Sequence, residues 1–274
     1  MDSGFAESWV PEGVDTTVAS PARVYDYGLG GSHNFAVDRQ VHDEFRRISP
    51  AAERSAWDNR AFLQRAVRFC QQQGIDQFLD LGSGVPTVGN VHEVAQQHDP
   101  AARVVYVDID PVAVAHSRRL LDGNEGAVAL QADMRHPDAI LEHPETRRLL
   151  DFDRPLAVLM VAMAHYLNDA DAPAAILARY RAAMAPGSLL VFSHITNEDF
   201  PEEISRGEAI FNAHLAEPMK ARTRAEISAL LDDFELVEPG LTYPALWRPD
   251  TPLPAEDDPR LSACLAAVGV PRGR

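Results

Sequence analysis

The stretch Phe78–Gly84, FLDLGSG, decides the fold. It is an apolar run that carries one carboxylate, Asp80, and then turns through Gly82 and Gly84. A glycine has no Cβ, so a Gly-x-Gly turn lets the backbone approach a ligand closely. A strand followed by such a turn is typical of a sheet that binds a ligand at its edge. The Gly-x-Gly spacing alone, however, is weak support for a ligand site.

Short apolar runs alternate with helical patterns on the C-terminal side of this turn. We predict five strands, at Gln77–Leu81, Arg103–Asp108, Ala127–Gln131, Pro155–Met163 and Gly187–Ser193. The helices between them are predicted at Asn90–Gln97, Pro111–Leu121 and Ala172–Met184. This alternation predicts an α/β fold with a mostly parallel sheet, whose ligands bind at the carboxyl ends of the strands. A helical insertion at about 197–232 and last strands at 234–237 and 261–270 complete the predicted core, residues 74–274.

The residues before the core are predicted to form a separate layer. Residues 1–20 are small, acidic and aperiodic, and we expect a flexible tail. Residues 21–73 are predicted to be an N-terminal loop and a helical cap, since apolar residues recur there at helical spacing up to Gly74. The loop is the stretch PARVYDYGLGGSHNF, Pro21–Phe35. Its tyrosines, Tyr25 and Tyr27, and its glycines, including Gly30, favour a lid over a ligand, although a loop anchored on the sheet by its tyrosines would look the same.

The glycine turn does not match a dinucleotide fingerprint. The third glycine of G-x-G-x-x-G would fall at Thr87, and Pro86 interrupts the loop. The next carboxylate at a strand end is Asp108, which lies 26 residues beyond Gly82 rather than about 20. These departures disfavour an NAD-dependent oxidoreductase, which we keep as an alternative.

Further polar or small residues stand at successive strand ends. Asp108 ends the second strand, where a carboxylate can accept hydrogen bonds from both hydroxyls of a ribose. Asp133 follows the third strand, in a position to accept a hydrogen bond from an exocyclic amine, and Ala162 ends the fourth. Asp108 and Asp133 could instead cap the helices that follow them. Together with Asp80 and the glycines, they favour one ligand site.

The order of these motifs, DLGSG, VYVDIDP and AD, resembles the class I S-adenosylmethionine-dependent methyltransferases. The longer phrases PARVYDYGLGGSHNFAVDR, FLDLGSGVPTVGNVHEVAQ, RVVYVDIDPVAVAHSR and RPLAVLMVAMAHYL are similar to the actinobacterial S-adenosyl methyltransferase family, formerly a domain of unknown function. The likeness spans most of the chain and implies a Rossmann-like methyltransferase sheet. It also implies S-adenosylmethionine as cofactor and S-adenosylhomocysteine as product.

The resemblance also assigns roles by position. Gly82, Ser83 and Gly84 would cradle the methionine part of the cofactor, with Asp80 near its amino group. Asp108 would hold the ribose. Ile109 and Met134 would flank the adenine, and Asp133 would contact the adenine amine. The pair Pro86–Thr87 departs from many methyltransferases, which enter the helix at once.

Two histidines are candidate catalytic residues. An oxygen or carbon nucleophile needs a base, whereas a neutral amine needs only orientation. His165 follows the fourth strand, on the rim where the methyl group should point, and His194 follows the fifth. A buried histidine bonded to the backbone is the ordinary alternative for His165. No set of His, Cys and Asp shows zinc spacing, and we predict no metal.

The amino acid composition restricts the kinds of molecule that this chain is expected to bind. The net charge is −16 at pH 7, and such an acidic protein disfavours nucleic acid as substrate. No apolar run reaches the roughly 20 residues that span a bilayer. Cys70 and Cys264 are far apart in sequence and suggest neither a disulfide framework nor a metal pair. We therefore predict a cytoplasmic methyltransferase of a small molecule, with a non-catalytic module that binds S-adenosylmethionine or its product as the second alternative.

Overall fold

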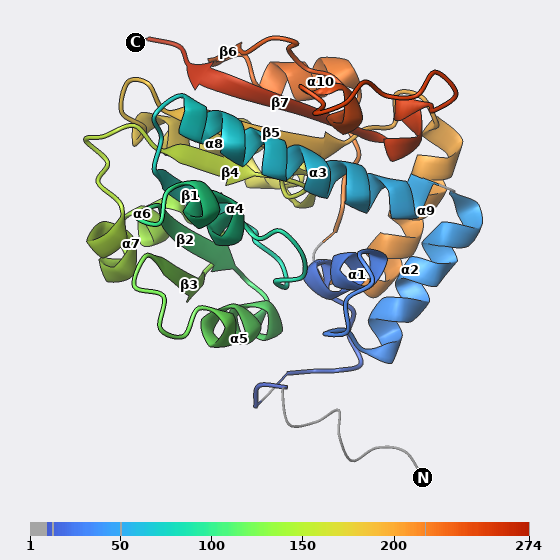
Figure 1. Ribbon diagram of the computed structural model, residues 1–274. Helices are drawn as coiled ribbons and strands as arrows, with labels where there is room; N and C mark the ends of the chain where they lie inside the picture. The colour runs from blue at the N-terminus through green and yellow to red at the C-terminus, as the bar shows by residue number, and fades with distance from the viewer. Residues whose placement is uncertain (1–9, 13, 50, 217, 274) are drawn as a thin grey trace.

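A seven-stranded sheet in the order β3-β2-β1-β4-β5-β7-β6 forms the centre of the computed structural model, as Figure 1 shows. The structure describes residues 10–12, 14–49, 51–216 and 218–273. Neighbouring strands from β1 to β5 pair in parallel, and β7 runs antiparallel to both β5 and β6. The strands are β1 (Gln77–Leu81), β2 (Arg103–Asp108), β3 (Ala127–Gln131), β4 (Ala157–Met160), β5 (Leu189–Ile195), β6 (Phe234–Leu236) and β7 (Cys264–Pro271). The prediction of a mostly parallel α/β sheet is confirmed.

Helices cover both faces of this sheet. On one face lie α3 (Ala51–Gln72), α4 (Val91–His98) and α5 (Pro111–Leu120). On the other lie α6 (Pro137–Leu141), α7 (Pro144–Leu149), α8 (Pro173–Ala182) and α10 (Arg224–Leu230). Because side chains alternate along a strand, Phe78 packs on the first face and Leu79 and Leu81 on the second. Burial on both faces explains why these strands read as continuous apolar runs.

Three further helices lie beyond the carboxyl ends of the parallel strands. They are α1 (Pro21–Gly28), α2 (Ala36–Ile48) and α9 (Pro201–His214), which stand together at one end of the molecule (Figure 1). Two short 3-10 helices follow β4, η2 (Ala164–Tyr166) and η3 (Asp169–Asp171), and two precede β7, η4 (Pro244–Leu246) and η5 (Pro259–Ser262). Helices α9 and α10 fall within the predicted insertion after the fifth strand. No helix in the described part of the chain has both the length and the apolar character to cross a membrane.

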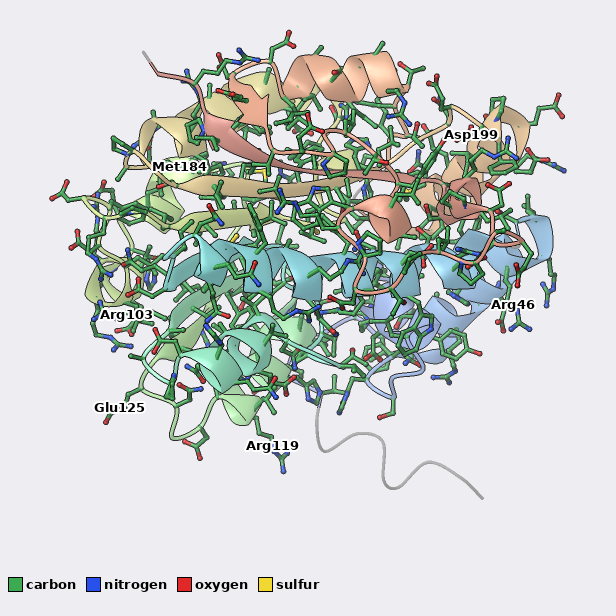
Figure 2. The ribbon with its side chains drawn as sticks, turned by 45° about the horizontal axis from the view of Figure 1, so that its top comes forward. Arg46, Arg103, Arg119, Glu125, Met184 and Asp199 are labelled. Carbon is green, nitrogen blue, oxygen red and sulfur yellow. The ribbon has the colours of Figure 1, made fainter. Side chains whose placement is uncertain are left out.

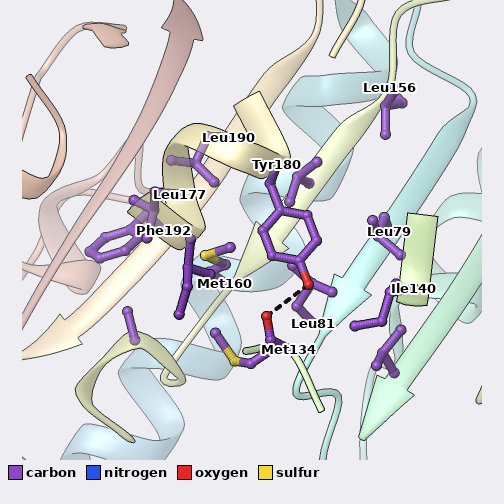
Figure 3. Packing of buried hydrophobic residues seen from close by; sticks show 14 of the residues in the cluster. Leu79, Leu81, Met134, Ile140, Leu156, Met160, Leu177, Tyr180, Leu190 and Phe192 are labelled. Carbon is purple, nitrogen blue, oxygen red and sulfur yellow. Dashed lines mark hydrogen bonds between the residues drawn. The ribbon is translucent and has the colours of Figure 1, made fainter. Parts of the chain in front are cut away.

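The packing of α8 on the sheet reaches the ligand end of the fold. Figure 3 shows Tyr180 of α8 among Leu79, Leu81 and Met160, with its hydroxyl directed at the Met134 carbonyl. The Tyr180 hydroxyl donates a hydrogen bond of 3.0 Å to that oxygen. This contact fixes the segment after β3, which contains two of the predicted site residues.

The prediction of a loop at Pro21–Phe35 is wrong for its first half, because Pro21–Gly28 is helix α1. Proline at the first turn suits a helix start. Arg23, Val24 and Asp26 are buried in this helix, and the two charged residues bond to distant parts of the chain. The stretch is rich in glycine and polar residues, and this composition indicated a loop. The residues that pair with Arg23 and Asp26 are remote in sequence, so no local pattern indicated that these charges are buried in a helix.

The fourth strand is shorter than the predicted Pro155–Met163. It ends at Met160 because Ala162 has a φ of +57°, which an extended strand does not allow. Part of the predicted tail, residues 1–9 and 13, lies outside the described residues. Within the described part, Ala19 and Ser20 are buried, so the ordered cap begins before Pro21.

Candidate active site

A cavity opens at the carboxyl ends of β1, β2 and β4, between the sheet and helices α1, α2, α3 and α9. A smaller side pocket adjoins it beside Asp133 and Met134. The two share Gly82, Asp108, Ile109, Met163 and Tyr166. The chain order of the sheet reverses between β1 and β4, and open α/β sheets bind ligands at such a switch point.

Most of the predicted site residues meet here. The cavity or the side pocket is lined by Tyr25, Asp80, Gly82, Ser83, Gly84, Asp108, Ile109, Asp133, Met134, Ala162 and His165. Tyr27, Gly30 and His194 line neither.

The glycine turn lies at the floor of the cavity. Gly82 and Gly84 have φ values of +74° and +67°, in the left-handed region that favours glycine. The N–H groups of Gly82 and Ser83 both donate to the Val107 carbonyl of β2, at 2.7 and 3.1 Å. A Cβ on Gly82 would stand 2.2 Å from Cγ of Met163, so a side chain here would also displace Met163.

Asp108 ties the second strand to this turn. One carboxylate oxygen accepts from the Gly84 N–H at 2.7 Å and the other from the Asp110 N–H at 2.9 Å. Burial raises the pKa of Asp108 to about 6, and the backbone hydrogen bonds oppose that rise. Asp108 lines both the cavity and the side pocket, so its carboxylate can accept further hydrogen bonds from a polyol bound in either of them.

Asp80 and Arg60 form a buried pair of opposite charges on the cavity wall. Asp80 is 6% exposed and Arg60, from α3, is 7% exposed. Burial raises the pKa of Asp80 to about 7, with Arg60 lowering it and Asp108 raising it. The Arg60 guanidinium lies 5.6 Å from the centre of the Tyr25 ring, and its Nε has no hydrogen-bond partner within the described residues. A cation beside an acid in one cavity suits a zwitterionic ligand.

The side pocket lies after β3. Asp133 there accepts the Arg135 backbone N–H at 2.8 Å, and its carboxylate pairs with the Arg135 guanidinium. Partial burial raises the pKa of Asp133, but the hydrogen bonds from Arg135 outweigh it and leave the pKa below its ordinary value. Met134 and Ile109 supply apolar faces on the same pocket.

A chain of hydrogen bonds connects the end of β4 to helix α1. The Ala162 N–H donates to Ser193 Oγ at 2.8 Å, and that hydroxyl donates to Asn59 Oδ1 at 2.5 Å. Asn59 Nδ2 donates to the Tyr25 hydroxyl at 3.2 Å, and Tyr25 donates to the Ala56 carbonyl at 3.0 Å. Tyr25 is thus held at the cavity wall by groups from α3 and β5.

Asp26 joins α1 to the loop after the glycine turn. Its carboxylate accepts from Thr87 Oγ1 at 2.8 Å, and from the His33 N–H and Asn34 Nδ2, both at 2.9 Å. Thr87 belongs to the pair Pro86–Thr87 that interrupts the glycine loop. Tyr27 instead packs its ring edge on His42, with ring centres 5.1 Å apart, and Gly30 is exposed with a φ of +79°.

The two candidate histidines differ in what they can reach. His165 is 2% exposed, lines the cavity, and its Nδ1 has no hydrogen-bond partner within the described residues. Burial lowers the pKa of His165 well below its ordinary value, with His194 and Arg222 adding to the effect.

His194 has both ring nitrogens engaged. Its Nδ1 lies 2.6 Å from the Ile195 carbonyl, so it carries the proton, and Nε2 accepts from Arg222 at 2.9 Å. Burial lowers the pKa of His194 to about 3. This histidine has no nitrogen left for a substrate, and it orders the strand end instead. Within the described ranges, no three His, Cys, Asp or Glu side chains gather as a metal site would require.

The residues that sequence reasoning missed lie mainly on α3. Ala56, Asn59, Arg60 and Leu63 all line the cavity. Their spacing of three and four places them on one helical face. Asn59 and Arg60 are therefore polar residues on a buried face, and that is the signal that could have revealed them. Met163, which lines the cavity, and Ser193, which bonds to Ala162 and Asn59, have no such feature in the sequence.

The strand order, the antiparallel β7 and the ligand-binding edge place this chain in the class of Rossmann-like methyltransferases. Solved structures agree with this class. A putative methyltransferase from Thermobifida fusca is 44% identical, with 97% of this chain and 100% of that chain covered and a TM-score of 0.90. A family protein from Streptomyces avermitilis, of the DUF574 group, is 36% identical, with 94% and 99% covered and a TM-score of 0.89.

A more distant likeness supports the fold alone. A putative methyltransferase in complex with the Trm112 activator of Haloferax volcanii is 18% identical, with 80% of this chain and 94% of that chain covered and a TM-score of 0.50. No curated protein matches the chain.

The model of the S-adenosyl methyltransferase family matches residues 7–272, and the chain belongs to that family. It is an S-adenosylmethionine-dependent methyltransferase, as the sequence predicted. The comparisons support neither the oxidoreductase nor the non-catalytic module.

The cavity fits this cofactor on its own geometry. The Gly-x-Gly turn permits close backbone approach, Asp108 offers a buried carboxylate at the end of β2, and the Arg60–Asp80 pair suits an amino acid moiety.

Proposed function

We propose that this methyltransferase acts on a small molecule, which enters the cavity between the sheet and helices α1, α2 and α9. The observation that carries the proposal is the enclosure of the cavity by the cap. Val24 of α1 and Phe211 of α9 line it although they are only 3% and 8% exposed. A nucleic acid or a folded protein would need an open approach to the same strand ends.

The distribution of charge supports the same choice of substrate. The net charge is −16, and the outward-pointing side chains labelled in Figure 2 include an acid, Glu125, as well as the arginines Arg46, Arg103 and Arg119. Binding to nucleic acid depends mainly on a gathered set of cations that meets the phosphates. A small acceptor does not need one.

We propose the following cofactor contacts. Asp108 binds the ribose hydroxyls, and the Gly82–Gly84 turn receives the methionine moiety. Asp133 accepts from the adenine amine, with Ile109 and Met134 on the faces of the ring. Support comes from their common position around the cavity and the side pocket.

We further propose that Asp80 binds the ammonium group of the methionine moiety and Arg60 its carboxylate. The buried guanidinium lies beside Asp80 and has an Nε without a partner among the described residues, so it suits a carboxylate. Tyr25 stands below Arg60 and closes this end of the cavity, in keeping with the predicted lid. Tyr27 and Gly30 are no longer included, since they line neither compartment.

S-adenosylmethionine supplies a methyl group bound to a positively charged sulfur, so the protein's task is positioning. We propose that neutral His165 accepts a hydrogen bond from the nucleophile of the acceptor. Its lowered pKa keeps the imidazole neutral, and in the tautomer with the proton on Nε2, the Nδ1 atom, which has no partner among the described residues, can accept that bond. The His194 ring packs against the His165 ring in a T-shaped contact, with the two ring centres 5.5 Å apart.

We also propose a cytoplasmic location and an actinobacterial origin. Two buried free cysteines, Cys70 and Cys264, accord with a reducing compartment. The Thermobifida and Streptomyces relatives accord with the origin.

Calorimetric titration with S-adenosylmethionine, S-adenosylhomocysteine and NAD tests the function. We expect the first two to bind and NAD not to bind. Asp108→Ala should weaken S-adenosylhomocysteine by at least about 100-fold, because the ribose hydroxyls lose a charged acceptor. Binding of NAD alone would refute the assignment, and unchanged affinity in the variant would refute the role of Asp108.

Two further variants separate the two sides of the cavity, by the same titration and by methyl transfer to a panel of small molecules. Arg60→Gln should weaken S-adenosylhomocysteine about ten-fold or more but leave 5′-methylthioadenosine, which lacks the amino acid, unchanged. His165→Ala should bind S-adenosylhomocysteine within about two-fold of the wild type and yet lose methyl transfer. Normal transfer by that variant would exclude His165 from the reaction.

A further inference from the structure

We propose that the methyl acceptor is an uncharged molecule built on an aromatic or similarly apolar ring, held in a chamber among α1, α2 and α9. This inference rests on the proposed small-molecule function and names its substrate class. The chamber is the part of the cavity walled by Val24, Phe45, Tyr166, Ile195, Phe211 and Met219.

These wall residues form one apolar body. All six belong to the same hydrophobic cluster, which joins α1, α2, η2, the end of β5, and α9 with the loop that follows it. Val24 and Met219 are each 3% exposed and both line the cavity, so little of this apolar wall is in contact with water. A ligand that displaces water from such a wall gains from apolar contact, not from hydrogen bonds.

Aromatic rings stand at several points of the wall. The Phe45 and Phe211 rings meet edge to face with their centres 5.3 Å apart, and each comes from a different helix. Tyr166 also lines the cavity. Because aromatic rings prefer offset or edge-to-face partners, this arrangement favours a ring in the acceptor.

The charged residues of the cavity lining come from elements other than those of the chamber wall. Among the described residues of α1, α2 and α9 that line it, none is Asp, Glu, Lys or Arg. The charged lining residues are Arg60 of α3 and the acids Asp80, Asp108 and Asp110 at strand ends. Asp110 is already paired with Arg23 at 2.9 Å. We have assigned the other three to the cofactor, so a charged acceptor would lie buried in the chamber without a counter-ion.

His165 offers a polar group beside the apolar wall. His165 lines the cavity next to Tyr166 and has an Nδ1 without a partner among the described residues. A neutral ring that carries one hydroxyl or similar group can present it there while the rest of the ring meets the apolar wall. A neutral imidazole, as its lowered pKa implies, is suited to such a group.

Binding of three naphthalene probes tests the proposal. The full chain is first saturated with S-adenosylhomocysteine and then titrated at pH 7.5 with 2-naphthol, 2-naphthoate and 2-naphthylmethylammonium. The three have the same ring system and differ in charge. We expect 2-naphthol to bind at least about ten-fold more tightly than either ion, because only the ions bury an unpaired charge.

The result that overturns the proposal is equal or tighter binding of either ion, or no binding of 2-naphthol while S-adenosylhomocysteine binds. Failure of S-adenosylhomocysteine itself would refute the proposed cofactor site instead. The two failures are therefore distinguishable.

A charge placed in the wall gives the matching test. Phe211→Glu should weaken 2-naphthol at least about ten-fold and improve the ammonium probe relative to it, with S-adenosylhomocysteine unchanged. Leu246→Glu, at a 38% exposed position of η4, is the control and should change no probe. If circular dichroism shows that the Phe211 variant is unfolded, Ile195→Glu, at a half-buried wall position, replaces it. Wild-type binding of 2-naphthol by a folded wall variant would overturn the location of the chamber.

Discussion

At the scale of the residue, the site contains carboxylates whose burial destabilises the ligand-free protein. Asp80 and Asp108 are both buried, and burial raises their pKa values to about 7 and about 6. Arg60 opposes the effect on Asp80 only in part. Burial of such a carboxylate destabilises the ligand-free protein, and groups with strongly shifted pKa values gather at functional sites.

Asp80→Asn should stabilise the ligand-free protein at pH 8. The pKa of Asp80 is raised, so the folded chain loses stability as the pH rises from about 3.8 to about 7, and the whole penalty is present above that window. We expect the free energy of unfolding at pH 8 to rise by roughly 1–4 kcal/mol in the variant. Urea unfolding at pH 8 and at pH 4 measures this, and the gain should shrink towards pH 4.

The same variant should bind S-adenosylhomocysteine poorly. For the wild type, affinity should rise by up to about ten-fold from pH 6 to pH 8, as Asp80 ionises. Asp80→Asn should lose most of this rise, whereas Asp133→Asn should keep it because the pKa of Asp133 lies below its ordinary value. An equal pH dependence in both variants would contradict the role of Asp80.

At the scale of the element, α1 is a helix that is held mainly by remote partners. Arg23 donates to Asp38 of α2 and to Asp110 at the start of α5, both at 2.9 Å. Asp26 receives Thr87 from the loop after the glycine turn. These bonds join the cap to both the second and first strand ends, so the position of α1 and the shape of the cavity depend on each other.

Asp26→Ala should destabilise the protein by roughly 2–4 kcal/mol, because one buried donor and two partly buried donors lose a charged acceptor. Affinity for S-adenosylhomocysteine should fall several-fold, since Thr87 loses its tie to α1. Asp122→Ala, at an exposed position, is the control and should change neither quantity. Thermal unfolding and calorimetry measure both effects, and wild-type stability in Asp26→Ala would refute the coupling.

At the scale of the whole molecule, the cap and the sheet share the site. The cavity takes its floor from the strand ends and its roof from α1, α2 and α9. The cluster around Val41, Phe211 and Leu215 binds the roof helices to one another, and Ile195 connects it to β5. A ligand in the cavity therefore touches both parts at once.

We expect the protein to unfold in one cooperative transition, with far-ultraviolet circular dichroism and tryptophan fluorescence giving the same midpoint. S-adenosylhomocysteine at 100 times its Kd should add about 2.7 kcal/mol to the free energy of unfolding. Two separate transitions, or a ligand effect on one probe only, would show that the cap folds independently of the sheet.

The sheet and the cofactor edge could be predicted because their signals are local. FLDLGSG and RVVYVD combine an apolar run with a carboxylate, and Gly82 and Gly84 have the left-handed φ that the turn requires. Strand ends of a parallel sheet gather at one edge whatever the rest of the chain does, so Asp80, Asp108 and Asp133 were brought together by topology alone.

Other features depended on which distant surfaces meet. Arg60 and Asn59 face the cavity because packing turned that side of α3 towards the strand ends, and helical spacing does not say which side that is. In the same way, packing placed Tyr25 on the cavity and Tyr27 against His42. It also left Nδ1 of His165 without a partner among the described residues, whereas Nε2 of His194 is bonded to Arg222. The sequence by itself determined the fold, the family and the cofactor edge. Only the tertiary structure decided the apolar chamber and the residues that face it, because each lies between segments that are remote in the chain.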